Sequence, residues 1–171
     1  MNNLILIGFM GAGKTTAGKL LAREKKMRFL DTDERISSEQ GREIRDIFAE
    51  DGEAYFRNLE TELLERMQED TAGAVISVGG GMPVRKRNRE LLQSLGCVVY
   101  LSASKQTILG RVQGDKSRPL LSGDNLEKKV EQLLKDREAI YRLTAHVEVR
   151  TDGRSIHQVM KIIDQETRKY M

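Results

Sequence analysis

Short, mostly apolar runs alternate along this chain with longer segments in which apolar residues recur every three or four positions. The short runs are typical of strands buried on both faces of a parallel sheet, and they lie at residues 4–7, 27–30, 74–78, 98–101 and 146–149. The longer segments predict helices that bury one face, at residues 16–23, 34–40, 43–50, 54–69, 87–95, 104–111, 125–142 and 154–170. Strands that alternate with helices predict an α/β fold of three layers, α/β/α, around a five-stranded parallel sheet with right-handed crossovers.

The first strand and the first helix enclose a glycine-rich loop. Residues 8–15 read GFMGAGKT and fit the phosphate-binding pattern G-x-x-x-x-G-K-[ST], the P-loop. Its glycines let backbone N–H groups converge on phosphate oxygens, and the start of the next helix adds a partial positive charge. The pattern predicts that Lys14 contacts the β- and γ-phosphates and that the Thr15 hydroxyl ligates Mg²⁺. A glycine turn with a chance lysine is the alternative, but the flanking strand and helix favour the P-loop.

Composition narrows the class of protein. The 171 residues are 39% hydrophobic and 32% charged, as is typical of one ordinary globular domain, and no linker or repeat divides residues 1–171. The net charge of +3 gives no reason to expect nucleic acid, and no apolar run reaches transmembrane length. We expect no signal peptide, no membrane partner and a cytoplasmic location. The single cysteine, Cys97, precedes a strand and is expected to be buried there.

Two carboxylates follow the second strand. Asp31 and Asp33 lie at the carboxyl end of that strand, where open parallel sheets bind ligands. Either acid could also begin the next helix as its N-cap. We expect both roles, with one acid capping the helix or supporting the metal site and the other facing the substrate.

An anion site is predicted from residues further along the chain. Arg57 and Glu60 are three positions apart and share a helix face, so they form either a surface ion pair or a pair in which Glu60 aims Arg57 at a carboxylate. Three glycines at residues 79–81 follow a buried strand directly, which indicates a close approach to the backbone more than a flexible linker. Together with Arg137, these groups predict a site for a substrate that carries a carboxylate and hydroxyls.

Other motifs separate the classes of P-loop protein. Residues 70–73 read DTAG, but they follow a charged helix, and nothing matches the N-K-x-D motif of a GTPase. Residues 121–123 supply only half of a transporter-ATPase signature. The third strand lacks an acid at its end, where a Walker B aspartate would bind Mg²⁺, so the metal must rely on Thr15, phosphates, water and Asp31. A small-molecule kinase is left, with Asp33 taking the proton of the acceptor hydroxyl.

The chain resembles the shikimate kinases, which are P-loop NTPases of the nucleoside monophosphate kinase-like fold. The matching pieces run from the first strand to the last helix, and their order and spacing together are highly specific. They are GFMGAGKT at 8–15, DTD at 31–33, DGE at 51–53 followed by Phe56, Arg57 and Glu60, GGG at 79–81, RPLL at 118–121, and Arg137 with Tyr141.

This resemblance implies ATP-dependent phosphorylation of the 3-hydroxyl of shikimate, with Mg²⁺ as the cofactor. It also implies a substrate-binding helical segment at about 32–62 and a lid at about 112–124, which we expect to be the most mobile part. The residues that it assigns to catalysis are Asp33, Lys14 and Arg118. Those that it assigns to ATP are Gly11, Ala12, Gly13, Lys14, Thr15, Thr16, Arg111, Arg118 and Arg154. Those that it assigns to shikimate are Asp33, Arg57, Gly79, Gly80, Gly81 and Arg137, with Mg²⁺ on Thr15 and, through water, on Asp31.

Two alternatives stay open at this point. A gluconate kinase would also act on a hydroxylated carboxylate, although the three glycines and the RPLL run favour shikimate. A nucleotide-sensing module would bind ATP and transfer nothing, and a missing acid or anion site would favour it. We expect the protein to be a monomer.

Overall fold

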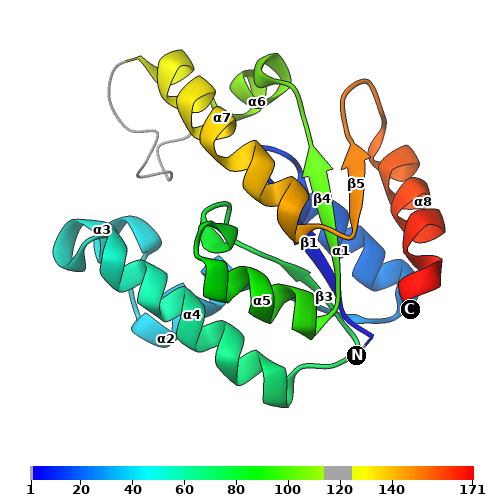
Figure 1. Ribbon diagram of the computed structural model, residues 1–171, viewed down its shortest axis with the longest axis horizontal. Helices are drawn as coiled ribbons and strands as arrows, with labels where there is room; N and C mark the ends of the chain where they lie inside the picture. Colours follow the sequence, from blue (N-terminus) through cyan, green and yellow to red (C-terminus); the bar gives the residue numbers. More distant parts are fainter. Residues whose placement is uncertain (1, 114–124) are drawn as a thin grey trace.

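The computed structural model describes residues 2–113 and 125–171. Within these residues a five-stranded sheet has the order β2-β3-β1-β4-β5, and all of its pairings are parallel (Figure 1). The strands are β1 (Leu4–Ile7), β2 (Arg28–Asp31), β3 (Ala74–Ser77), β4 (Cys97–Ser102) and β5 (Val147–Arg150). The predicted fold class is confirmed.

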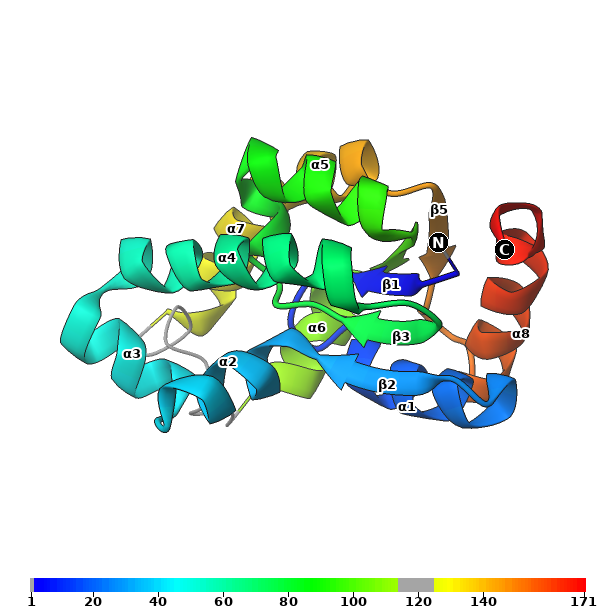
Figure 2. The ribbon, with the colours of Figure 1, turned by 90° about the horizontal axis from the view of Figure 1, so that it is seen from below.

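Helices α1 to α7 connect consecutive strands, α8 follows β5, and together the helices cover both faces of the sheet (Figure 2). The described α-helices are α1 (Lys14–Lys25), α2 (Thr32–Gln40), α3 (Ile44–Asp51), α4 (Glu53–Asp70), α5 (Lys86–Leu95), α6 (Lys105–Val112), α7 (Leu126–Thr144) and α8 (Ile156–Thr167). Two short 3₁₀ helices are η1 (Met82–Val84) and η3 (Arg168–Tyr170).

Strand β1 lies at the centre of the sheet and contributes side chains to two apolar cores, one on each face. Because successive side chains of a strand point to opposite faces, Ile5 and Ile7 pack into one apolar cluster, and Leu4 and Leu6 pack into another. The first cluster includes residues of α4, α5 and α7, and the second includes residues of α1 and α8. This double burial explains why β1 reads as an unbroken apolar run.

Most predicted elements end within two residues of the observed bounds, and the differences have local causes. The last helix was predicted to begin at residue 154, but it begins at Ile156, because Ser155 and Gln158 form a capping box. The predicted helix at 154–170 therefore divides into α8 and η3. The 3₁₀ helix η1 was not predicted, since its three residues are too few to show a period. None of the described helices is long and apolar enough to cross a membrane.

A buried asparagine ties together the edge of the sheet where the strands begin. Asn3 is completely buried, and its Nδ2 donates to the carbonyl oxygens of Thr71 and Leu95, each at 2.9 Å. Its Oδ1 accepts from the N–H of Ala74 at 3.0 Å. Three of the four hydrogen-bonding positions of the amide are thus used, and because buried hydrogen bonds are costly to lose, Asn3 anchors this edge.

We predict that Asn3→Ala lowers the free energy of unfolding by about 2–4 kcal/mol, because it leaves buried backbone groups without partners. Urea denaturation of the two proteins measures this loss. Asn2→Ala is the matched control, since Asn2 is exposed next to it, and it should change stability little. Equal stability of both variants would contradict the anchoring role.

Candidate active site

The P-loop begins where β1 ends. Gly11 and Gly13 have φ angles of 79° and 93°, in the left-handed region that favours glycine. Gly13 is also the N-cap of α1 and has no side chain to occupy the first N–H groups of the helix. These donors and the helix dipole therefore face the loop, which is the arrangement that binds phosphate.

The polar side chains of the loop are held from two directions. Lys14 Nζ donates to the carbonyl oxygens of Gly8 at 2.7 Å and Phe9 at 3.0 Å. Thr15 Oγ1 donates to Asp31 Oδ2 at 3.1 Å, which joins the P-loop to the end of β2. The Lys14 ammonium is thus held by the start of the loop, and the Thr15 hydroxyl by the end of β2.

Asp31 has a second structural role. Its Oδ1 accepts from the backbone N–H of Asp33 at 3.0 Å and of Glu34 at 3.3 Å, so Asp31 is the N-cap of α2. The expectation that one acid caps this helix is confirmed, and Asp33 is left in the first turn. The Thr15 hydroxyl and the Asp31 carboxylate are hard oxygen donors of the kind that Mg²⁺ prefers. Because the described residues contain no group of three or more His, Cys, Asp or Glu that could hold a metal, phosphate oxygens would have to complete this site.

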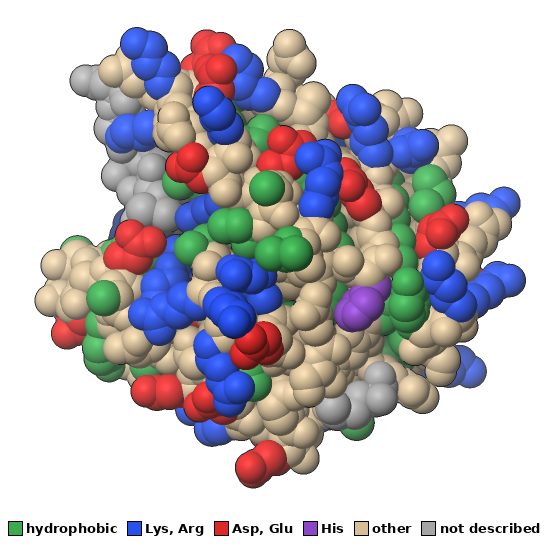
Figure 3. Space-filling view, in the orientation of Figure 1, with side chains coloured by type: hydrophobic (Ala, Val, Ile, Leu, Met, Phe, Trp, Pro, Cys, Tyr) green, Lys and Arg blue, Asp and Glu red, His purple; other side chains and the backbone are tan. Residues whose placement is uncertain are grey.

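The P-loop and the predicted anion site line one cavity of about 720 Å³. It lies at the edge where the strands end, between the P-loop, α2, α3, α4, α7 and the glycines after β3. The predicted site residues that line it are Gly11, Gly13, Lys14, Thr15, Thr16, Asp31, Asp33, Arg57, Gly79, Gly80, Gly81 and Arg137. On the molecular face shown in Figure 3, Lys and Arg side chains gather between α3 and α5. This distribution favours an anionic ligand near the same edge.

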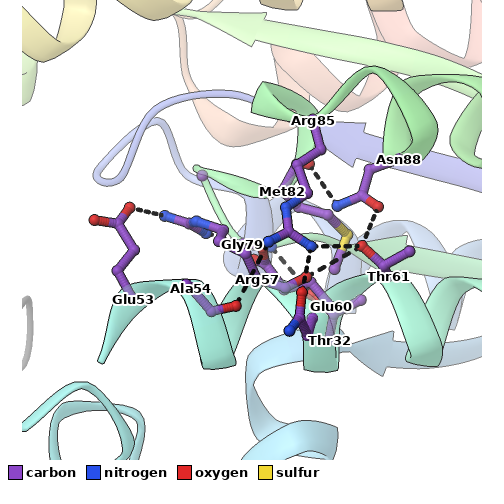
Figure 4. Close-up of polar contacts among 12 residues, drawn as sticks. Thr32, Glu53, Ala54, Arg57, Glu60, Thr61, Gly79, Met82, Arg85 and Asn88 are labelled. Atoms are coloured by element: carbon purple, nitrogen blue, oxygen red, sulfur yellow. Dashed lines mark hydrogen bonds and ion pairs between the residues drawn. The ribbon is translucent and has the colours of Figure 1, made fainter. Parts of the chain in front are cut away.

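A buried ion pair forms one wall of the cavity. Arg57 Nη1 lies 2.8 Å from Glu60 Oε2, and Arg57 Nη2 lies 3.2 Å from Glu53 Oε1 (Figure 4). Glu60 is completely buried and Arg57 is 8% exposed, so the interpretation as a surface ion pair is wrong. Burial raises the pKa of Glu60 to about 7, against the opposing charge of Arg57.

Side chains of the protein itself make the close approaches to two of the three glycines, Gly79 and Gly81. A Cβ on Gly81 would lie 2.2 Å from Arg57 Nη2, and a Cβ on Gly79 would lie 2.6 Å from Asp33 Oδ1. The Gly79 N–H donates to Thr32 Oγ1 at 3.1 Å. Larger residues would therefore displace the guanidinium and the carboxylate that the sequence assigns to the substrate.

Helix α7 supplies the opposite wall. Arg137 is 5% exposed, and its Cζ lies 6.0 Å from the ring centre of Phe9 in the P-loop. One turn later, the buried Tyr141 donates its hydroxyl to the carbonyl oxygen of Gly80 at 2.6 Å. The helix thus contacts the P-loop and the glycines from the same face.

A second, smaller cavity of about 240 Å³ lies on the other side of the P-loop. Of the residues that the sequence assigns to ATP, it is lined by Ala12, Gly13, Thr16, Arg111 and Arg154. Arg111 Nη1 donates to the carbonyl oxygen of Gly11 at 2.8 Å, so α6 is fixed to the loop. The proposed lid residue Arg118 lies outside the described residues, as do residues 114–124 of the proposed lid.

Sequence reasoning missed the groups that support these walls. Thr32 holds the N–H of Gly79, and a buried Asn88 lies behind the glycines. Thr32 gave no signal, since it looks like any residue between two acids. Asn88 did give one, because it is a polar residue on the face of α5 that otherwise buries leucines.

The raised pKa of Glu60 generates a pH-dependent prediction. Its carboxyl faces Arg57 on its own helix, Asp33 on α2 and Arg137 on α7. Between its ordinary value of 4.5 and about 7, the folded protein keeps a proton on Glu60 that the unfolded chain has lost. The contribution of this group to the free energy of unfolding therefore falls as the pH rises through that interval.

Glu60→Gln removes this titration. We expect the stability of the wild type relative to the variant to be most favourable near pH 5 and to decrease towards pH 7.5. Urea denaturation of both proteins across this range measures the difference. Parallel pH profiles would show that Glu60 keeps its ordinary pKa.

Comparisons with known proteins agree with this geometry. A gluconokinase from Sinorhizobium meliloti has a similar structure, with a TM-score of 0.59 over 98% of this chain and 92% of that chain, but its 14% identity shows a likeness of fold alone. The structure of a shikimate kinase from Acinetobacter baumannii in complex with shikimate is much more similar. Its TM-score is 0.92 at 39% identity, with 96% of this chain and 92% of that chain covered.

The sequence comparisons cover nearly the whole chain. The family model for shikimate kinase matches residues 10–167. A shikimate kinase from Persephonella marina is 39% identical over 163 residues, which are 95% of this chain and 97% of that protein. The chain therefore belongs to the shikimate kinase family.

Proposed function

We propose that this protein transfers the γ-phosphoryl group of ATP to the 3-hydroxyl of shikimate, giving shikimate 3-phosphate for aromatic amino-acid biosynthesis by way of chorismate. Membership of the family supports the reaction class. The observation that carries the assignment of the site is that one cavity is lined both by Lys14 and Thr15 and by Asp33, Arg57 and Arg137. A phosphate donor and a hydroxylated carboxylate would meet there.

The nucleotide half of this proposal uses the P-loop and the second cavity. Backbone N–H groups from Gly11 to Thr16 and the Lys14 ammonium would hold the phosphates. Mg²⁺ would bind the Thr15 hydroxyl and, through water, Asp31, and when bound it offsets charge on the β- and γ-phosphates. Arg111 and Arg154 would border the adenosine in the second cavity.

The acceptor half uses the opposite walls. The guanidinium groups of Arg57 and Arg137 would bind the shikimate carboxylate, because the planar fork of arginine matches a carboxylate, and residues 79–81 would pack against the ring. Asp33 would accept the proton of the 3-hydroxyl as its oxygen attacks the γ-phosphorus. The bond from that phosphorus to the bridging oxygen breaks, and ADP leaves as Lys14 stabilises the transferred charge.

Other parts of the proposal concern the whole molecule. We propose one domain, with residues 32–62 as the shikimate-binding segment and residues 112–124 as a lid whose Arg118 contacts ATP. The protein would act as a monomer in the cytoplasm, on two small molecules and without nucleic acid. The likeness to a gluconokinase is one of fold and favours no second substrate.

The proposed reaction is tested by measuring ADP formation with ATP, Mg²⁺ and each of shikimate, gluconate and AMP. We expect turnover with shikimate alone, and phosphorus NMR should place the new phosphate on the 3-hydroxyl. Turnover with gluconate or AMP but not shikimate would contradict the substrate assignment. ATP binding without any turnover would support the nucleotide-sensing alternative.

We predict that Asp33→Asn lowers kcat by about 10²–10⁴-fold while shikimate still binds, because the amide keeps a hydrogen bond but is a poor base. Steady-state kinetics check this prediction. They are measured at several Mg²⁺ concentrations, because the Asp33 N–H bonds to Asp31, which would bind Mg²⁺ through water.

Arg137→Lys is the complementary variant. It keeps the charge but loses the fork, so it should raise KM for shikimate more than it lowers kcat.

The opposite result for Asp33 is informative. If Asp33→Asn keeps a normal kcat and only raises KM, Asp33 positions the hydroxyl and is not the base.

A further inference from the structure

One buried polar side chain lies behind the glycines and has no role in the reaction as derived so far. Asn88 is completely buried in α5, on the face that also buries Leu91, Leu92 and Leu95. An apolar residue at this position would continue the core without a requirement for partners. The amide therefore has a function that a leucine could not supply.

The contacts of Asn88 join three separate elements (Figure 4). Its Nδ2 donates to the carbonyl oxygen of Met82 at 2.9 Å, in the 3₁₀ turn that follows the glycines. Its Oδ1 lies 2.7 Å from Thr61 Oγ1 on α4. The same hydroxyl lies 3.1 Å from the carbonyl oxygen of Arg57, so its single hydrogen has two acceptors. The amide provides both the donor and the acceptor that these two contacts need, whereas an aliphatic side chain provides neither.

A continuous series of polar contacts results between the two parts of the anion site. It runs from the backbone of Arg57 through Thr61 and Asn88 to Met82, whose N–H donates to the carbonyl oxygen of Gly79 at 3.0 Å. This series sets the distance between α4 and the turn of residues 79–82. That distance is critical, because a Cβ on Gly81 would already lie 2.2 Å from the Arg57 guanidinium.

We propose that Asn88 is a positioning residue for the carboxylate site, which holds the turn of residues 79–82 against α4 so that Arg57 and the glycines face the acceptor together. This inference rests on the proposed function, in which these groups bind shikimate. Asn88 itself touches no substrate. Its hydrogen bonds join Thr61 on α4 to Met82 in the turn, and among the described residues none goes to the P-loop, so it acts on binding of the acidic acceptor more than on the nucleotide.

The test compares Asn88→Ala with Asn3→Ala. Both residues are completely buried asparagines that bond to backbone groups, but Asn3 lies at the opposite edge of the sheet. We expect Asn88→Ala to raise KM and Kd for shikimate by about tenfold or more, with KM for ATP changed less than twofold and kcat changed less than KM. Asn3→Ala should lower stability and leave both KM values unchanged. Equal KM values for shikimate in the two variants would overturn the proposal.

A second pair of variants covers the case in which Asn88→Ala does not fold. Thr61→Val keeps the shape of the side chain and removes the hydroxyl that faces Asn88, whereas Thr61→Ser keeps the hydroxyl. Thr61→Val should raise KM for shikimate, whereas Thr61→Ser should have a KM for shikimate close to that of the wild type. Equal effects of the two substitutions would overturn the proposal.

Hydrogen exchange separates this inference from the proposed function, because it needs no ligand. Amides in residues 79–84 should exchange faster in Thr61→Val, and in Asn88→Ala where it folds, than in the wild type, while amides of α1 and α8 keep their protection. If the wild type shows no turnover with shikimate, the proposed function fails and the exchange result still decides the role of Asn88. Unchanged exchange in residues 79–84 would overturn that role.

Discussion

The buried pairing of Arg57 with Glu60 is the interaction on which the acceptor side of this structure depends. Above the raised pKa of Glu60 the pair carries two charges, and because removing both from water is costly, only close geometry and further hydrogen bonds offset that cost. Here Glu60 is completely buried, and Arg57 also reaches Glu53. The guanidinium is thereby fixed before any ligand arrives, so binding an anion requires little reordering of the side chain. The same pairing forbids a side chain at Gly81.

The two halves of the cavity come from different parts of the fold, and parallel pairing brings them together. Because β1, β2 and β3 run in the same direction, the P-loop, Asp31 and the glycines all emerge at one edge. Helix α2 then begins with Asp31 as its cap, and this places Asp33 beside Gly79. A hydrogen bond from Thr15 to Asp31 links the phosphate side directly to the start of the acceptor side.

The sequence predicted what depends on local pattern. The strands and the class of sheet were predictable because short apolar runs alternate with helical segments. The P-loop was predictable because its glycines and its lysine stand at fixed positions within eight residues. An acidic cap for α2 was predictable too, but the sequence did not distinguish Asp31 from Asp33 as that cap. Burial of Glu60 was not, because a glutamate three residues after an arginine looks the same on a surface helix and in a core. Contacts such as that of Asn88 with Met82 depend on how α5 packs, and no local pattern contains that information.

The contact between two buried tyrosine rings behind the glycines has an optical consequence. The chain has four tyrosines and no tryptophan, so its intrinsic fluorescence comes from tyrosine alone. Tyr141 bonds to the backbone of Gly80, and its ring centre lies 5.1 Å from that of Tyr100, whereas Tyr55 and Tyr170 are exposed. Any shift of α7 relative to the glycines alters the surroundings of the buried Tyr141, and no tryptophan fluorescence masks the resulting change in its emission. The protein therefore contains its own spectroscopic label at the junction between the P-loop, α7 and the acceptor wall.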